Sequence, residues 1–145
     1  MSGILMGIAI RNAKKSQMLQ INNAQVTKQF GIANDFRGKP GNRQVTILSH
    51  ESWLKVCHEL KQDLDWTTRR ANLFVRGLDL KNSVGKEIKI GDVLLRITGE
   101  TDPCSRMDDS YMGLQKSLAL NWRGGVCCTV IEEGEIFINQ TVSIN

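Results

Sequence analysis

The sequence has few of the features that mark secreted or membrane-bound proteins. No apolar run comes near the roughly 18 residues that a membrane-spanning helix needs. The apolar run at residues 4–10 has no basic residue before it and no small-residue cleavage site after it, so we interpret it as a buried strand and not as a signal peptide. We therefore expect a cytoplasmic protein with no membrane partner.

Strong charge is also missing. The 19 basic and 15 acidic residues leave a net charge of +4, and no run of like charge is longer than a pair such as Lys14-Lys15 or Arg69-Arg70. The three tryptophans are scattered and do not alternate with basic residues. This balance allows an anionic ligand, but we expect no nucleic-acid partner.

Common metal-binding patterns of cysteine and histidine are absent. The four cysteines form no C-x-x-C pair, and the two histidines lie apart from Cys104, so we expect no structural zinc site and free thiols throughout. Cys57 falls on a predicted apolar helix face, where a free cysteine acts as a small core residue. Cys127 and Cys128 share a predicted strand, so only one of them is expected to face the core.

Short strands and turns are abundant. The length suits a single domain, residues 1–145, and 13 glycines indicate many turns. The apolar runs predict about eight short strands and two or so helices, which favours a mainly β fold built as a closed or nearly closed barrel. One hairpin is predicted around Gly91-Asp92 and a second from Val126 to Ile138 around Glu133-Gly134. Further strands are predicted near residues 4–10, 19–21, 24–26, 45–47, 73–75 and 142–144.

The predicted helices are recognised by capping and spacing. Ser49 can cap the first helix, and Glu51 lies in its first turn, where the helix dipole favours negative charge. An apolar stripe then continues for about four turns. Its members are Trp53, Cys57, Leu60 and Leu64, and a second, shorter stripe consists of Leu114, Leu118 and Trp122.

The polar segment TDPCSRMD, residues 101–108, follows a predicted strand and is interpreted as an exposed loop. Pro103 restricts the backbone before Cys104, and Arg106 can favour the thiolate, whereas Asp102 and Asp108 oppose it. Only the thiolate is a nucleophile or a ligand for soft metals. Cys104 is therefore the candidate reactive residue; the alternative is a half-buried loop cysteine without chemistry.

Three arginines adjoin strand ends or glycines. Arg43 and Arg70 precede predicted strands, and Arg123 precedes Gly124-Gly125, where a backbone can approach a ligand closely. The planar guanidinium matches the oxygens of a phosphate. Any one of these arginines alone is more simply a solvated surface residue.

The order of four segments resembles the MOSC family, which is named for the C-terminal domain of molybdenum-cofactor sulfurase. The segments are RQVTILSHESW from residue 43, RRANLFVRGLDL from residue 69, VGKEIKIGDVLLRITGETDPCSRMD from residue 84, and RGGVCCTVIEEGEI from residue 123. Together they extend over most of the chain from about residue 31 onward. The resemblance suggests a small, stand-alone MOSC member.

The resemblance implies a β-barrel that binds the molybdenum cofactor, molybdopterin. It implies that Cys104 either carries sulfur as a persulfide or ligates molybdenum, and that basic residues hold the phosphate of the pterin. The first mode suggests a cysteine desulfurase or a molybdoenzyme as partner, with pyridoxal phosphate entering only through that partner, and the second suggests reduction of N-hydroxylated compounds. The expected cofactor-binding residues are Arg43, Arg70, Asn72, Arg123, Gly124 and Gly125.

Two segments depart from the family pattern, and one of them is Asn139-Gln140, where the family often ends on a glycine-aspartate turn. In the other, the chain has Asn34-Asp35-Phe36-Arg37 where the family usually has glycine-aspartate followed by histidine. This departure motivates an alternative, a non-catalytic binding or partner module that keeps the barrel with a degenerate site. The sequence leaves the two modes of Cys104, this alternative and the oligomeric state open.

Overall fold

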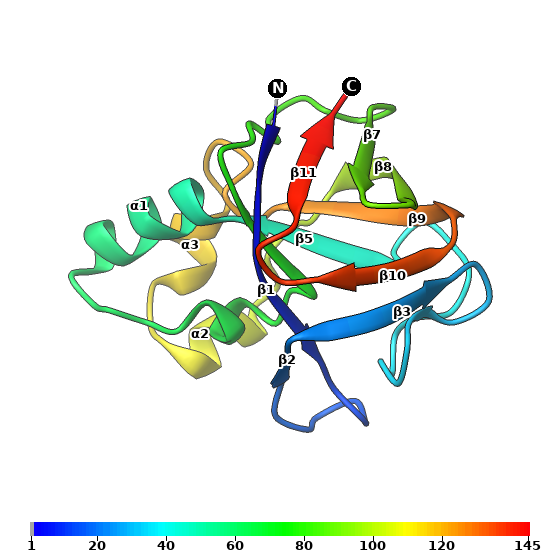
Figure 1. Ribbon diagram of the computed structural model, residues 1–145. Helices are drawn as coiled ribbons and strands as arrows, with labels where there is room; N and C mark the ends of the chain where they lie inside the picture. The colour runs from blue at the N-terminus through cyan, green and yellow to red at the C-terminus, as the bar shows by residue number, and fades with distance from the viewer. Residues whose placement is uncertain (1) are drawn as a thin grey trace.

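The computed structural model describes residues 2–145, which form a seven-stranded closed barrel with three short helices (Figure 1). Strands β1 and β11 close the barrel by pairing antiparallel, with Ser2 opposite Ser143, so the two chain ends lie side by side. The mainly β barrel predicted from the sequence is confirmed. In barrel order the strands are β11 (Thr141–Ile144), β7 (Glu87–Ile90), β8 (Val93–Glu100), β9 (Val126–Glu132), β5 (Val45–Ser49), β6 (Leu73–Arg76) and β1 (Ser2–Ile10).

Apolar side chains at alternate positions of the strands fill the barrel. Along β8, Val93, Leu95 and Ile97 are buried, whereas Arg96 between the last two is exposed. Because strand neighbours point to opposite faces, one face of each strand supplies the core. The predicted hairpin at Gly91-Asp92 joins β7 to β8, and Gly91 adopts the positive φ of 58° that such a turn favours.

The second predicted hairpin is wrong. Strand β10 (Gly134–Phe137) does not fold back on β9 but pairs with β3 (Asn23–Thr27), which also pairs with β4 (Gly31–Ile32) in a separate three-stranded sheet. The Glu133 carboxylate accepts a hydrogen bond from the Lys28 backbone N–H, which ties the corner to this sheet. The short strand β2 (Leu19–Ile21) extends the barrel sheet beside β1.

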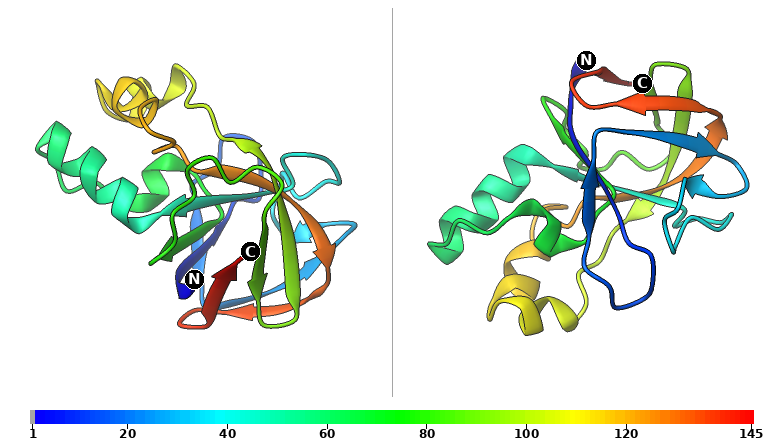
Figure 2. Two further views of the ribbon diagram at one scale, coloured as in Figure 1. Left: turned by 90° about the horizontal axis from the view of Figure 1, so that it is seen from above. Right: turned by 60° about the horizontal axis from the view of Figure 1, so that its bottom comes forward.

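The helices gather on one side of the barrel (Figures 1 and 2). Helix α1 (His50–Leu60) begins at Ser49, whose hydroxyl accepts from the Ser52 backbone N–H, as predicted. It ends at the left-handed Lys61, one turn earlier than the apolar stripe suggested. The shorter helices are α2 (Arg106–Ser110), which was not predicted, and α3 (Leu114–Leu118). Within residues 2–145, no helix is long and apolar enough to cross a membrane.

An apolar cluster outside the barrel fixes these helices. Trp53 and Val56 of α1 are buried in it with Leu114 and Leu118 of α3. Cys57 of the predicted stripe is half-buried at its margin. The helices thus pack around a second apolar core outside the barrel. The loops between the two cores carry the candidate functional residues.

Candidate functional site

A cleft of about 460 Å³ is formed by residues that follow strands β1 and β8 and by residues that come just before strands β5 and β6. This volume lies within the range of roughly 300–1,000 Å³ that is typical of small-molecule sites. The exposed Cys104 lies in its wall. The basic residues that line it are Arg11, Lys14, Lys15, Arg43, Arg69, Arg70 and Arg106, against a single carboxylate, Asp109.

Cys104 lies in the loop between β8 and α2. Its backbone oxygen accepts a hydrogen bond from the Met107 N–H in the first turn of α2. Partial burial alone would raise the pKa of the thiol, but hydrogen bonds from the Arg106 backbone and side chain and the charges of Arg106 and Arg69 outweigh it, so the pKa is lowered. A lowered pKa increases the fraction of reactive thiolate near neutral pH.

Arg69 is one of the residues that sequence reasoning missed. Only 5% exposed, it donates from Nε to the Gly124 oxygen (3.2 Å) and from a terminal nitrogen to the Thr101 oxygen (3.3 Å). Its other terminal nitrogen lies 3.9 Å from the Met107 sulfur. The guanidinium thus joins the segments on both sides of Cys104. In the sequence it was visible only as one member of a basic pair.

Local structure sends the two neighbouring arginines in different directions. The 3₁₀ helix η1 (Trp66–Arg69) is fixed by Trp66, which stacks on Phe74 with ring centroids 4.9 Å apart. Arg70 follows in the left-handed conformation, with φ of 64°, and ends the helix. Both side chains line the cleft, but that of Arg69 is buried, whereas that of Arg70 is half-buried and donates to the Ser16 oxygen at 2.6 Å.

The basic residues of the cleft lack carboxylate partners. Among residues 2–145 the ion pairs are Arg96–Glu87 and Arg123–Glu59, neither of which involves a residue lining the cleft. Burial lowers the pKa of Arg69 to about 10, with a further contribution from Arg43. Burial and then the neighbouring Arg70 and Arg37 lower the pKa of Arg11 to about 10 as well. The guanidiniums stay protonated at neutral pH and repel one another, so the cleft favours an anion.

Asn72 adjoins the cleft, but its amide is already fully used. Its Oδ1 accepts from the N–H (3.0 Å) and hydroxyl (3.2 Å) of Thr46. Its Nδ2 donates to the Ala9 oxygen and to Asp35 Oδ2, each at 3.2 Å. Asn72 therefore fixes β1, β5 and β6 relative to one another instead of presenting a free amide edge to a ligand.

Residues 34–37, a segment that differs from the family pattern, also lie beside the cleft. Asp35 Oδ1 accepts from the Arg11 backbone N–H at 3.1 Å, and Arg37 lines a smaller cavity together with Arg11, Arg43, Arg70 and Asn72. No pattern in the sequence indicated that Asp35, from a loop distant in the chain, would hydrogen-bond to both Arg11 and Asn72.

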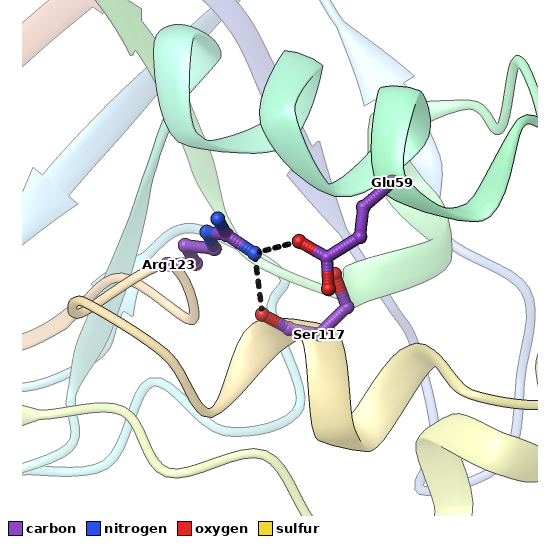
Figure 3. A network of polar contacts seen from close by, with 3 residues as sticks. All are labelled: Glu59, Ser117 and Arg123. Carbon is purple, nitrogen blue, oxygen red and sulfur yellow. Dashed lines mark hydrogen bonds and ion pairs between the residues drawn. The ribbon is translucent and has the colours of Figure 1, made fainter.

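Arg123 does not line the cleft. It pairs with Glu59 of α1 at 2.6 Å and donates to the Ser117 backbone oxygen in α3 at 3.3 Å (Figure 3). The hydrogen bond from Arg123 is the main cause of a lowered pKa of Glu59. Arg123 thus links two helices.

Gly124 and Gly125 serve close backbone packing. Gly124 borders a small cavity with Arg43, Arg69 and Arg70, but a side chain there would collide with the Thr101 oxygen. Gly125 has a φ of 92°, and a side chain on it would collide with the Ile47 oxygen. The expected glycine contact to a ligand is therefore limited to the edge of Gly124.

The other cysteines are enclosed. Cys128 faces the barrel interior and is fully buried, which raises the pKa of its thiol far above the ordinary range. Cys127 points the opposite way, as strand geometry predicts, yet it is also buried, with its sulfur 3.2 Å from the Thr101 hydroxyl oxygen. Both faces of β9 are covered here, so neither thiol competes with Cys104 for a solvent-borne reagent.

A larger cavity, about 590 Å³, lies elsewhere, between the start of α1 and Trp122. Its two lysines, Lys55 and Lys81, are matched by Glu51 and Asp79, and no cysteine lines it. We therefore place the candidate site at the Cys104 cleft, where a nucleophile and unpaired positive charge coincide.

Comparisons with known proteins agree with this architecture. The MOSC domain model matches residues 16–143, so the chain belongs to the MOSC domain family, which is associated with molybdenum-cofactor-related proteins. The fold is similar to that of the YuaD protein from Bacillus subtilis (TM-score 0.85, 19% identity, 99% of this chain and 96% of that chain). It is also similar to YiiM from Escherichia coli (TM-score 0.76, 16% identity, 100% and 70%) and YiiM from Geobacillus stearothermophilus (TM-score 0.80, 15% identity, 99% and 75%). The comparison with curated protein sequences gives no significant match.

Proposed function

We propose that the cleft binds the molybdenum cofactor and that Cys104 is the reactive residue there. The observation that carries this proposal is the opening of an exposed, activated thiol into a cleft lined by basic residues without carboxylate partners. Membership of the MOSC family supplies the class of ligand.

The residues present fit the cofactor. Arg43 and Arg70 line all three adjoining cavities, and neither is engaged by a carboxylate, so both are available for a phosphate. When bound, the cofactor would supply a thiophilic molybdenum centre, for which a thiolate is a suitable ligand.

Two modes of Cys104 use the same geometry. In one, its thiolate accepts sulfane sulfur from a partner such as a pyridoxal-phosphate-dependent cysteine desulfurase and passes it on as a persulfide. In the other, it ligates molybdenum in a site that reduces N-hydroxylated or similar compounds. Arg69 and Arg106 would hold the thiolate in both modes.

The altered segment at residues 34–37 supports a working site over a degenerate one. Asp35 retains two hydrogen bonds that position Arg11 and Asn72, and Arg37 adds positive charge beside them. A degenerate site that has lost its ligand would not need this concentration of unpaired charge, which disfavours folding of the empty protein.

Expression in cells that make the cofactor tests the proposal. The purified protein is assayed for molybdenum and for pterin fluorescence, and Cys104→Ser is compared with Cys57→Ser, which changes a thiol outside the cleft. Retention of both signals by the wild-type protein and loss of molybdenum only in Cys104→Ser supports the ligand mode. Absence of molybdenum together with labelled sulfur on Cys104 supports the carrier mode. If the wild-type protein carries neither the cofactor nor sulfur, the proposal is refuted and the non-catalytic binding module remains.

A further inference from the structure

The positive charge of the cleft exceeds what one phosphate group engages. Seven basic residues line it and one carboxylate, Asp109, opposes them. Lys14 and Lys15 come from the loop after β1, Arg106 from the start of α2, and Arg43 from the loop before β5. Arg106 and Arg69 act directly on the Cys104 thiol, and the other basic residues line the same cleft, so an anion bound in the cleft can lie beside the thiol.

Arg69 provides a second, independent indication of an anion. It is 5% exposed, lines the cleft, and bonds only to two carbonyls and a thioether, none of which carries a charge. A buried guanidinium without a carboxylate retains an unbalanced charge. That charge lies at the base of the Cys104 loop, so it stabilises negative charge on the sulfur of Cys104 and on groups bound next to it.

We propose that Cys104 takes sulfane sulfur directly from a small thiosulfonate anion, of which thiosulfate is the simplest, with the cleft arginines binding its sulfonate oxygens. This inference rests on the carrier mode of the proposed function and specifies its sulfur donor. It requires no partner enzyme for loading.

The transfer is a balanced displacement. The Cys104 thiolate attacks the outer sulfur of thiosulfate, a new S–S bond forms, the S–S bond of thiosulfate breaks, and sulfite leaves with the electron pair. The product is the Cys104 persulfide anion. A second thiolate, or cyanide in an assay, then attacks the outer persulfide sulfur and releases the Cys104 thiolate, so neither an oxidant nor a reductant is consumed.

The cleft removes the main obstacle to this reaction. A thiolate and a thiosulfate dianion repel each other, and the leaving sulfite is again a dianion. Fixed positive charges that surround both groups cancel the repulsion during approach and stabilise the negative charge on the leaving group. Guanidiniums suit this task because their paired N–H donors match neighbouring oxygens of a tetrahedral oxyanion.

The test compares an anionic and a neutral donor on the full chain. The reduced protein, freed of reductant, is incubated with thiosulfate or with a dialkyl trisulfide. With thiosulfate, addition of one sulfur atom is followed by intact mass, and turnover by thiocyanate release in cyanide. With the trisulfide, the Cys104 thiolate attacks an outer sulfur and an alkyl persulfide leaves, so this reaction is followed as addition of one alkylthio group to Cys104. The variants are Cys104→Ser with Cys57→Ser as its control, and Arg43→Gln with Arg76→Gln as its control, because Arg43 and Arg76 are both exposed but only Arg43 lines the cleft.

Thiosulfate is expected to load wild-type and Cys57→Ser protein but not Cys104→Ser. Arg43→Gln should lower kcat/KM for thiosulfate by roughly tenfold to hundredfold, the usual effect of losing a charge-assisted contact, while Arg76→Gln leaves it unchanged. The rate with the neutral trisulfide should be the same in both arginine variants.

Other results overturn the inference in distinguishable ways. Reaction with the trisulfide but not with thiosulfate means that the thiolate is reactive and that the donor class is wrong, which leaves a carrier mode loaded by a partner enzyme. An equal loss with both donors in Arg43→Gln means that the arginine does not recognise the anion. If neither donor reacts with Cys104 but the protein retains the cofactor, only the ligand mode remains. If neither donor reacts and the protein holds no cofactor, the proposed function is refuted as well.

Discussion

Replacement of Arg69 by methionine tests how the site is held together. Methionine has a side chain of similar length but no donors, so the Gly124 and Thr101 carbonyls lose their partner. Thr101 and Gly124 are both buried, so water does not readily replace the guanidinium. The change therefore acts on the support of the Cys104 loop without altering Cys104.

The expected change in the free energy of unfolding of Arg69→Met follows from two opposing contributions. Hydrogen bonds from a charged donor contribute about 1.5–3 kcal/mol each, so the loss of two costs roughly 3–6 kcal/mol. Removal of a buried cation that has no carboxylate partner offsets part of this loss of stability, because desolvation of such an ion costs several kcal/mol. We expect a net decrease of about 1–3 kcal/mol in the free energy of unfolding.

The assay combines chemical denaturation with thiol alkylation at a series of pH values. The charge of Arg69 contributes to the lowered pKa of Cys104, so the alkylation midpoint should rise in Arg69→Met. Arg70→Met is the control for stability. Arg70 is half-buried and makes a single bond, to the Ser16 oxygen, which water can partly replace, so its loss should cost less than the loss of the two buried bonds of Arg69. Equal stability of Arg69→Met and wild type, with an unshifted alkylation midpoint, would refute the supporting role of Arg69.

Three further predictions follow from the same geometry. Inorganic phosphate should raise the thermal midpoint of the wild-type protein through preferential binding to the folded state, and Arg43→Gln should reduce this shift; no shift in the wild-type protein contradicts an anion site. In the native protein Cys104 should alkylate first, with a midpoint below that of an ordinary thiol, while Cys128 reacts only after unfolding, as peptide mapping would show; early labelling of Cys128 contradicts the buried assignment. Arg123→Ala should lower the free energy of unfolding while leaving the cofactor content per folded molecule unchanged; loss of cofactor from the folded variant would show that Arg123 belongs to the cofactor site.

Local patterns in the sequence predicted the parts of the fold that depend on neighbouring residues. The Ser49 cap and the Gly91-Asp92 hairpin each need only a few adjacent positions. The β9–β10 hairpin failed because the partner of β10 is β3, more than a hundred residues earlier, and local patterning cannot choose between two possible partners.

The site was only partly predictable for the same reason. Cys104 and Arg43 were recognised from their loops, and the structure places both at one cleft. Arg123 was grouped with them because glycines follow it, but its direction is set by Glu59 on α1, which only the folded chain brings near. Arg69 was overlooked because a buried arginine is rare and nothing in its sequence neighbours distinguishes it from Arg70.

The electrostatics of the cleft also explain why stability and function are opposed here. The side chains that would bind an anion are crowded together without an ion-pair partner, and the lowered pKa values of Arg11, Arg69 and Arg70 reflect burial together with repulsion from neighbouring arginines. A carboxylate paired with these arginines would relieve that repulsion, but it would also occupy the donors that a ligand needs. The barrel supplies the compensating stability through a core that contains no cleft residue, so the loops at this end can retain unpaired charge for an anion to neutralise.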